Sequence, residues 1–183
     1  MNFTDAGIPG ALVIDPELHR DERGFFARTF CKDELRSHGI EFDCIQCNLS
    51  SNAMRGTLRG MHYQTSPHGE CKIVSCVAGS IFDVIIDLRE SSPTFRRWVG
   101  IELSAVNNRM LYIPEGVAHG FLTLENETLV SYLMGARYHA PSGKGVRWDD
   151  PAFGVVWPFA PSTISQKDAG YSDLKMAAGS PSV

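Results

Sequence analysis

Apolar and polar residues alternate along this chain in many short runs. In residues 71–90, "CKIVSCVAGSIFDVIIDLRE", a turn signal at Ala78-Gly79-Ser80 separates two of them. Four apolar side chains of the second run share one face of an extended strand: Phe82, Val84, Ile86 and Leu88. Asp83 and Asp87 fall on the opposite face. We expect the aspartate face to line a wet cavity, because a closed core does not favour two carboxylates.

Three later segments continue the alternation: "FRRWVGIELS", "RMLYIPEGVAHGFLTL" and "ETLVSYLMGARYH". Short strands at intervals of roughly 8–12 residues are typical of an antiparallel sandwich or barrel. One short helix is expected in "CKDELRSHGI", which carries Gly39 near its end. The pattern therefore predicts one all-β, jelly-roll-type domain over residues 1–183 with few short helices. We expect residues 175–183 to form a flexible tail.

Composition narrows the possible partners. Of 183 residues, 43% are hydrophobic and 21% charged, with a net charge of −4. No global basic field favours nucleic acid, so an anionic ligand needs a local cluster of basic side chains. No apolar run approaches the roughly 18 residues of a membrane span. The first residues also lack a secretory signal pattern, and we expect a cytoplasmic protein without membrane or nucleic-acid partners.

Five cysteines are present, and two of them, Cys44 and Cys47, have C-x-x-C spacing. Together with Cys71 and Cys76, this spacing is one that a structural zinc site could use. Both pairs fall in strand-like segments, however, where residues three or five apart point to opposite faces. The sequence therefore predicts neither a structural zinc site nor a redox pair, and the odd number argues against a disulfide framework.

Two histidines, His62 and His119, lie in strand-like segments whose other residues are mostly apolar. The spacing Pro114-x-Gly116-x-x-His119 matches the second half-motif of the metal-binding cupins, whose first half-motif requires H-x-H. Gln64 stands where the second histidine would be, and Glu70 is wrongly spaced as a replacement. Because a mononuclear site normally needs three protein ligands, we expect no metal.

General acid–base chemistry fits these residues better than hydrolysis, since no G-x-S-x-G nucleophile motif is present. His62 could act as the base. Three aspartates could orient it, and the choice among them stays open: Asp83, Asp87 and Asp168. Tyr132 and Tyr138 are candidate proton donors, and Lys72 could stabilise an oxyanion.

Arg59 and His62 pose a geometric problem. They are three residues apart in "TLRGMHYQ", so a regular strand would send them to opposite faces. Gly60 could mark a bulge that redirects one side chain. If both residues serve one cavity, the strand must be irregular near Gly60.

Several longer blocks resemble the dTDP-4-dehydrorhamnose 3,5-epimerase family. In chain order they are "DERGFFARTF", "QCNLSSNAMRGTLRGMHYQ", "ECKIVSCVAGSIFDVIIDLRESSPTFRRW", "LYIPEGVAHGFLTL", "GVRWDDPAFGVVWP" and "SQKDAGYSDL". The resemblance covers about residues 4–174. It implies a cupin-type jelly roll without a catalytic metal or cofactor, a homodimer, and a nucleotide-linked 4-keto-6-deoxy sugar epimerised beside its ketone.

The resemblance also implies roles for individual residues. His62 matches the base, Asp168 its orienting carboxylate, Tyr132 the proton donor and Lys72 the lysine near the sugar oxygens. Further residues match substrate contacts: Arg23 and Arg59 near the diphosphate and sugar, Tyr138 on the nucleotide base, and Gln46, Asn48, His119 and Lys167 elsewhere.

The chain departs from the family pattern in three stretches, each of which lacks an acidic residue: at Arg28, which we still count among the substrate contacts, at Cys47, and at Gly143 with Lys144. The acid–base set is intact, so the expected reaction class is unchanged. The identity of the sugar and base stays open. The alternatives are a mono-epimerase or ketoisomerase acting on a CDP- or GDP-linked sugar, and a non-catalytic sugar-nucleotide-binding cupin.

Overall fold

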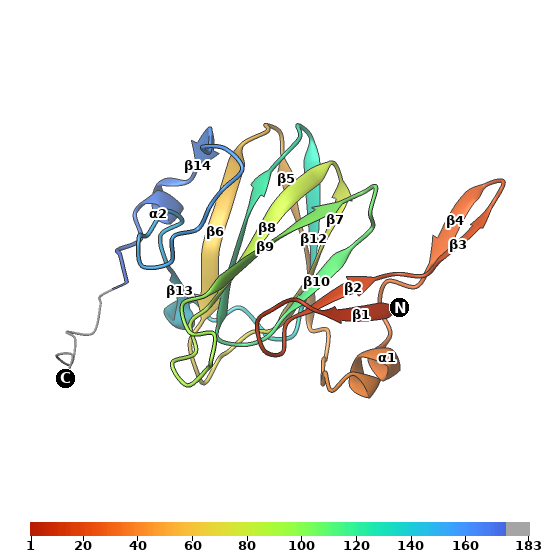
Figure 1. The fold of residues 1–183 in the computed structure, drawn as a ribbon, viewed down its shortest axis with the longest axis horizontal. Coiled ribbons are helices and arrows are strands. Elements are labelled where there is room, and N and C mark those ends of the chain that lie inside the picture. Colours follow the sequence, from red (N-terminus) through yellow and green to blue (C-terminus); the bar gives the residue numbers. More distant parts are fainter. Residues whose placement is uncertain (175–183) are drawn as a thin grey trace.

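The computed structural model describes residues 1–174 and consists mainly of two facing β-sheets (Figure 1). The strands are β1 (Asn2–Asp5), β2 (Leu12–Asp15), β3 (Leu18–Asp21), β4 (Gly24–Ala27), β5 (Gln46–Asn52), β6 (Thr57–Gln64), β7 (Lys72–Ala78), β8 (Ser80–Asp87), β9 (Trp98–Ser104), β10 (Met110–Ile113), β11 (Val117–Thr123), β12 (Thr128–Met134), β13 (Gly143–Gly145) and β14 (Thr163–Ile164). The helical elements are α1 (Lys32–Ser37), the 3-10 turn η1 (Ala140–Ser142) and α2 (Gln166–Ala169). The predicted all-β jelly-roll architecture with few short helices is confirmed. The predicted flexible tail lies outside the described residues.

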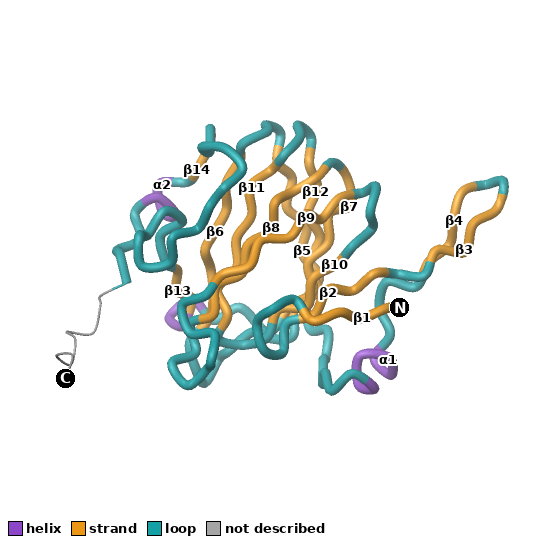
Figure 2. Tube along the Cα trace, viewed as in Figure 1, coloured by secondary structure: helices purple, strands orange, loops and turns teal. Residues whose placement is uncertain are grey.

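The first sheet has the strand order β1-β2-β10-β7-β12-β5, and the second has β13-β6-β11-β8-β9. All of these neighbours pair antiparallel, while β14 adds to β6 in parallel. Strands β3 and β4 form a separate two-stranded arm that projects away from both sheets (Figures 1 and 2). The arrangement leaves β5 as an edge strand and places β6 beside the C-terminal segment.

The main core lies between the two sheets. Val74 of β7 and Val130 of β12 face Ile81 and Ile85 of β8, and all four are fully buried. The opposite face of β8 is buried as well, because Val84 packs in a cluster covered by the segment that follows β13. The predicted division of apolar residues on β8 is therefore confirmed, and both faces of this strand are covered.

Helix α1 covers the outside of the first sheet. Its residue Leu35 is buried with Phe42 against Ile73 and Tyr112. Asp33 and Glu34 lie in its first turn, where carboxylates favour the positive end of the helix dipole. The chain then leaves the helix through Gly39, at φ +78°, which confirms the predicted short helix and its end. Within residues 1–174, no helix has the length and apolar character needed to cross a membrane.

Candidate active site

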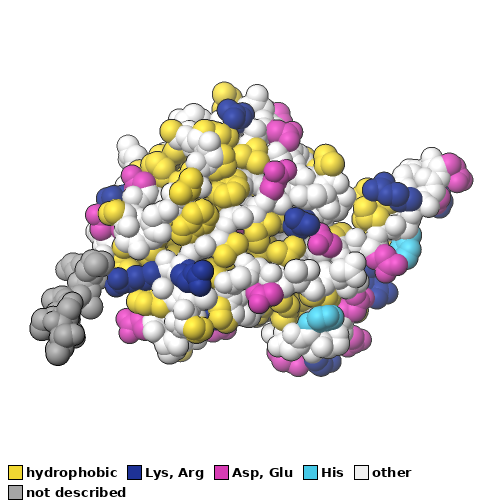
Figure 3. Space-filling model, viewed as in Figure 1, with side chains coloured by type: hydrophobic (Ala, Val, Ile, Leu, Met, Phe, Trp, Pro, Cys, Tyr) yellow, Lys and Arg dark blue, Asp and Glu magenta, His cyan; other side chains and the backbone are white. Residues whose placement is uncertain are grey.

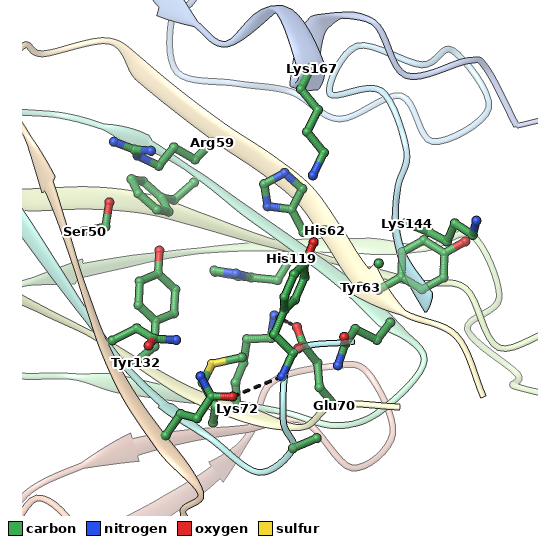
Figure 4. Close-up of a pocket in the computed structure, with 18 of the residues that line it drawn as sticks. Ser50, Arg59, His62, Tyr63, Glu70, Lys72, His119, Tyr132, Lys144 and Lys167 are labelled. Atoms are coloured by element: carbon green, nitrogen blue, oxygen red, sulfur yellow. Dashed lines mark hydrogen bonds and ion pairs between the residues drawn. The ribbon is translucent and has the colours of Figure 1, made fainter. Parts of the chain in front are cut away.

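A cavity of about 400 Å³ opens between the two sheets. Strands β5, β7 and β12 of the first sheet contribute side chains to it, and so do β6 and β11 of the second. Figure 4 shows Arg59 and Tyr132 on one side of this space and Tyr63 with Lys144 on the other. The cavity thus has walls from two independent sheets, which allows groups to approach a bound molecule from opposite directions.

Strand β6 is irregular at Gly60. His62 pairs with His119 of β11, and Arg59 pairs with Phe121, so three steps along β6 correspond to two along β11. Gly60 has φ +122°, and the Gly60–Met61 peptide bond is cis. Because β6 carries one extra residue here, Arg59 and His62 both line the cavity. The irregularity that the sequence predicted near Gly60 is confirmed.

His62 is hydrogen-bonded to Asp168, with 2.7 Å between Nε2 and Oδ1. The other oxygen of Asp168 accepts a hydrogen bond from the Gly60 backbone N–H at 3.3 Å. Asp168 has only 7% of its side chain exposed, whereas His62 has 42% exposed toward the cavity. A carboxylate on Nε2 fixes the imidazole ring and leaves Nδ1 available to accept a proton.

The single turn of α2 places Asp168 against β6. Ser165 caps the turn by accepting a hydrogen bond from the Asp168 N–H at 3.1 Å. Just before it, β14 pairs with the start of β6 through Thr163 and Ile164. The C-terminal segment is therefore aligned along β6 just before Asp168. Of the three aspartates that the sequence left open, Asp168 is the one that contacts His62.

His119 forms a second histidine–aspartate pair. Its Nε2 lies 2.7 Å from Oδ1 of Asp83, and both side chains are almost completely buried. Burial raises the pKa of Asp83, although attraction to His119 and Lys72 acts in the opposite direction. His119 lines the cavity while Asp83 lies behind it. Held by Asp83, the imidazole of His119 can present a ring nitrogen to a substrate oxygen.

The prediction that the aspartate face of β8 lines a wet cavity is wrong. Asp83 is fully buried behind His119 and does not line the cavity. Asp87 is also fully buried and lies at the strand end, where it accepts hydrogen bonds from Arg89, Ser92 and Thr94. The three partners of Asp87 compensate its burial, whereas Asp83 has His119 on Oδ1 and no hydrogen-bond partner on Oδ2 among the described residues. The alternation pattern does not reveal these contacts.

Lys72 and Glu70 form a buried ion pair on the cavity wall. Nζ and Oε1 are 2.6 Å apart, and only 6% and 9% of the two side chains is exposed (Figure 4). Breaking such a pair leaves an uncompensated charge in a poorly solvated place. Lys72 is thereby held at a defined position, with its charge near the cavity.

Tyr132 stands on β12, in the sheet opposite to His62. Burial raises its pKa, the nearby Asp83 raises it further, and Arg59 acts in the opposite direction. The phenol therefore keeps its proton throughout the neutral range. Its ring lies edge-on to His119, with 6.2 Å between ring centres.

The cavity brings together most of the side chains selected from the sequence. Its lining includes His62, Lys72 and Tyr132, together with the expected contacts Gln46, Asn48, Arg59, His119, Tyr138 and Lys167. Four of its lining residues are lysine or arginine: Arg59, Lys72, Lys144 and Lys167. Among the described lining residues, Glu70 is the single acid. A local positive field suited to an anionic ligand thus exists despite the net charge of −4.

Arg23 and Arg28 are not brought to this cavity within one chain. Arg23 lies at the tip of the β3–β4 arm and pairs with Asp21, and its side chain is 83% exposed. Arg28 lies after the arm and pairs with Glu34 of α1. Figure 3 shows the arm that carries Arg23 projecting from the body of the molecule, whereas Arg28 is held at α1.

Several lining residues were not selected from the sequence. Tyr171 lies against the His62 ring, with 6.1 Å between ring centres, and belongs to the block "SQKDAGYSDL". Tyr63 and Lys144 are cross-strand partners on β6 and β13. Glu70 was considered as a metal ligand and instead holds Lys72. Its E-x-K spacing on an extended segment, which puts both side chains on one face, was the signal that could have indicated the pair.

The described residues do not assemble a metal site. His62, His119 and Glu70 are each engaged by a separate partner: Asp168, Asp83 and Lys72. In residues 1–174, no group of three or more His, Cys, Asp or Glu side chains is placed to hold a metal ion.

Comparisons with known proteins agree with this geometry. Residues 5–176 match the family described as dTDP-4-dehydrorhamnose 3,5-epimerase. The chain belongs to this family. It is 41% identical over 177 residues to the dTDP-4-dehydrorhamnose 3,5-epimerase of Methanothermobacter thermautotrophicus, with 94% of each chain covered.

Solved structures extend the likeness to three dimensions. The dTDP-4-dehydrorhamnose 3,5-epimerase of Bacillus anthracis, with TDP and pyrophosphate bound, superposes with a TM-score of 0.92 at 38% identity, covering 94% of this chain and 99% of that one. A 3'-monoepimerase from Streptomyces bikiniensis in complex with dTDP-quinovose superposes with a TM-score of 0.86 at 32% identity, covering 91% and 85%. The two solved structures, described as a 3,5-epimerase and a 3'-monoepimerase, thus share the scaffold of this chain.

Proposed function

We propose that this protein epimerises a dTDP-linked 4-keto-6-deoxy sugar at C3, at C5 or at both. The observation that carries this proposal is the placement of a histidine base and a protonated tyrosine on opposite sheets of one cavity. Epimerisation removes a proton from one face of a carbon and returns a proton to the other face. His62 and Tyr132 are positioned for these two tasks.

His62 is the proposed base. The sugar ketone acidifies the neighbouring C–H bonds, and the imidazole accepts the proton while Asp168 stabilises the resulting imidazolium. The hydrogen bond of 2.7 Å between the two side chains supports this role. His62 is also open to the cavity, as a base that must reach a carbon-bound proton has to be.

Lys72 and His119 are the proposed stabilisers of the enolate oxygen. Removing the proton moves negative charge onto the former ketone oxygen, and a cation in a partly dry cavity interacts strongly with that charge. Lys72 is almost buried and is held by Glu70. His119 is fixed by Asp83 on the same cavity wall as His62.

Tyr132 is the proposed acid that returns a proton on the face opposite to His62. A phenol with a raised pKa is protonated at neutral pH and is available to donate. Donation would leave a phenolate in a buried place, which Arg59 helps to compensate, because it favours the ionised form.

The nucleotide end fits the more open part of the cavity. Arg59, Lys144 and Lys167 supply positive charge suited to a diphosphate. Tyr138 is 65% exposed, and its backbone N–H donates to the Gln46 side chain at 3.0 Å, which leaves its ring free to stack on a base.

The three departures from the family pattern do not all reach this region. Arg28 pairs with Glu34, and Cys47 lies on the opposite face of β5 from Gln46 and Asn48. Gly143 and Lys144 both line the cavity, and Gly143 lies beside the Tyr138 ring. We therefore retain dTDP as the proposed nucleotide. If this protein prefers another nucleotide base, we assign that difference to the space beside Tyr138.

We also propose that the protein is a homodimer in which each arm reaches the cavity of its partner. Phe25 and Phe26 of the arm are 48% and 75% exposed, an unusual placement for large apolar side chains unless another surface covers them. An arm laid across a second cavity would bring the exposed Arg23 to the diphosphate. This would reconcile the role expected for Arg23 with its distance from the cavity of its own chain.

Deuterium incorporation tests the reaction. The protein is incubated with dTDP-4-keto-6-deoxyglucose in D2O, and exchange at C3 and C5 is followed by proton NMR. Exchange with inversion at both carbons identifies a 3,5-epimerase, and exchange with inversion at one carbon identifies a mono-epimerase. Absence of exchange with dTDP-, CDP- and GDP-linked substrates would overturn the proposal and leave the binding-protein alternative.

Subunit mixing tests the dimer. Arg23→Ala and His62→Ala are prepared separately, each with low activity, and then mixed under conditions that allow subunits to exchange. A mixed dimer that shares arms contains one cavity with both intact groups, so activity should recover. No recovery in mixtures shown to contain heterodimers would contradict shared cavities, and a monomer in sedimentation analysis would contradict the dimer itself.

A further inference from the structure

Cys44 and Cys47 place their sulfur atoms 3.7 Å apart at the protein surface. The prediction that they point to opposite faces is wrong. Cys44 lies before β5, which begins at Gln46, so strand alternation does not apply to it. The chain bends at this point, and the Cys44 thiol faces the carbonyl oxygen of Gln46 at 3.7 Å.

The separation is close to the contact distance of two sulfur atoms. A disulfide needs about 2.05 Å, so the sulfurs would have to approach by roughly 1.6 Å. Cys44 is outside the sheet ladder and can make this movement, while Cys47 is held by its pairing with Leu133 of β12. No third thiolate, histidine or carboxylate in residues 1–174 completes a metal site around them, which favours exchange with disulfides over metal binding.

We propose that Cys44 and Cys47 form a reversible disulfide in exchange with low-molecular-weight disulfides of the glutathione type, and that this bond adjusts one wall of the substrate cavity. The thiolate of Cys47 attacks the small disulfide and releases one thiol, which leaves a mixed disulfide on Cys47. Cys44 then attacks the Cys47 sulfur and releases the second thiol. Two protein thiols are oxidised, one disulfide is reduced, and both protons leave with the released thiols.

The environment of Cys44 indicates that it is the second thiol to react. Partial burial and the neighbouring Cys47 sulfur raise the pKa of the Cys44 thiol. Less of it is therefore thiolate at neutral pH than of an ordinary cysteine, which makes it a poor first nucleophile. Proximity to the mixed disulfide compensates for this in the intramolecular step.

The link to the cavity is Gln46, which lies inside the ring that the disulfide would close. Its side chain lines the cavity and accepts the hydrogen bond from the Tyr138 backbone. The preceding residue, Ile45, donates a backbone hydrogen bond to Met134 at 2.8 Å. Moving Cys44 toward Cys47 therefore shifts a segment that positions the nucleotide end of the cavity.

Mass and thiol measurements test the bond without any reference to activity. The reduced full-length protein is equilibrated with mixtures of oxidised and reduced glutathione, alkylated, and analysed by intact-mass and peptide mass spectrometry. We expect a loss of about 2 Da, as two hydrogens leave, and a peptide containing linked Cys44 and Cys47. Cys31→Ser, at a partly exposed cysteine elsewhere, should behave as the wild type.

Single variants separate the two cysteines. Cys44→Ser should trap glutathione on Cys47, because no second thiol resolves the mixed disulfide, and Cys47→Ser should lose the intramolecular product. An unchanged mass over the whole range of glutathione mixtures would overturn the proposal. So would disulfide-linked dimers in place of the internal bond on non-reducing gels.

The effect on the cavity rests on the proposed function and has its own readout. Oxidation should raise KM about 2- to 10-fold with a smaller change in kcat, since roughly one hydrogen bond at the nucleotide end is at stake. Dithiothreitol should reverse the change, and Cys44→Ser/Cys47→Ser should be insensitive. An oxidised protein with unchanged KM would refute the coupling. A protein inactive in both states would refute the epimerase proposal, whereas the thiol result stands by itself.

Discussion

His62 and Asp168 are 106 residues apart in the chain and meet with 2.7 Å between Nε2 and Oδ1. Burial of Asp168 opposes ionisation, but hydrogen bonds from His62, from the Gly60 backbone and from Ser165 outweigh it and lower the pKa of the carboxyl. Asp168 is therefore a carboxylate whenever His62 is able to act as a base. The ring orientation depends on this contact.

Asp168→Asn should reduce deuterium exchange by about 10²–10⁴-fold while the fold is retained, because asparagine preserves the shape and removes the charge that stabilises the imidazolium. Exchange rates under saturating substrate give the measurement, with circular dichroism as the check on folding. Asp149→Asn, at an aspartate paired with Arg147 away from the cavity, is the matched control. Near-normal exchange in Asp168→Asn would mean that the charge of Asp168 does not support proton removal by His62.

Tyr132→Phe should separate proton removal from inversion. The phenylalanine ring fills the same space on β12 but cannot donate, so His62 can still exchange a proton while the opposite-face protonation fails. We expect deuterium to enter with retained configuration and epimer formation to fall by about 10²-fold or more. Product analysis by NMR distinguishes the two. Tyr112→Phe, at a buried tyrosine outside the cavity, is the control, and unchanged inversion in Tyr132→Phe would exclude it as the acid.

Glu70→Gln tests whether the ion pair with Glu70 fixes the position of Lys72. The variant keeps a hydrogen-bonding side chain but removes the countercharge 2.6 Å from the ammonium group. We expect the free energy of unfolding to fall by about 1–3 kcal/mol and kcat to fall more than KM rises, because Lys72 loses its fixed position. Urea unfolding and steady-state kinetics give the two values. Glu115→Gln, at an exposed glutamate, should change neither, and a Glu70→Gln enzyme of normal stability would contradict a structural ion pair.

Gly60→Ala should destabilise the protein and displace His62. A Cβ at Gly60 would lie 2.4 Å from Gly120 Cα and 2.8 Å from the His119 carbonyl oxygen. Gly24 has a similar φ, +127° against +122°, yet a Cβ added there would meet no atom within 4 Å. Comparing Gly60→Ala with Gly24→Ala thus isolates the collision from the backbone preference.

Thermal and urea unfolding measure the difference between these two variants. We expect Gly60→Ala to lose about 1–3 kcal/mol more than Gly24→Ala, together with most of the exchange activity. Equal losses of stability would mean that the close approach of β6 and β11 is not the constraint at Gly60.

Local patterns in the sequence predicted the strands and one irregularity. Alternation placed Val84 and Ile86 on one face of β8, as found, because strand periodicity is a local property. Arg59 and His62 could be assigned to one cavity only if the strand was irregular between them, and the glycine at position 60 was a usable signal. The short helix before Gly39 was equally local.

Contacts between distant segments could not be predicted in the same way. The carboxylate that holds His62 depends on where β14 and α2 lie along β6, which no local pattern reports. Cys44 was misplaced because its strand begins two residues later than assumed. Arg23 was selected by resemblance alone, and no rule based on one chain brings it to the cavity from the tip of the arm.

Asp87→Asn provides a test of acid stability away from the cavity. Asp87 is buried, which opposes ionisation, but hydrogen bonds from Arg89, Ser92 and Thr94 outweigh burial and lower the pKa of its carboxyl far below its usual range. A carboxyl whose pKa is lower in the folded than in the unfolded protein stabilises the fold at pH values above its unfolded-state pKa. This contribution is lost as the pH falls from the unfolded-state pKa toward the folded-state pKa.

At pH 7, Asp87→Asn should therefore lower the free energy of unfolding by about 1.5–3 kcal/mol, the range for hydrogen bonds to a charged group. The gap between wild type and variant should shrink as pH falls below about 4, where the unfolded carboxyl becomes protonated. Urea unfolding at a series of pH values measures both. Glu90→Gln, at an exposed carboxylate nearby, should show no such gap. A gap for Asp87→Asn that stays constant from pH 7 to about 2 would show that the ionised form is not what its three partners stabilise.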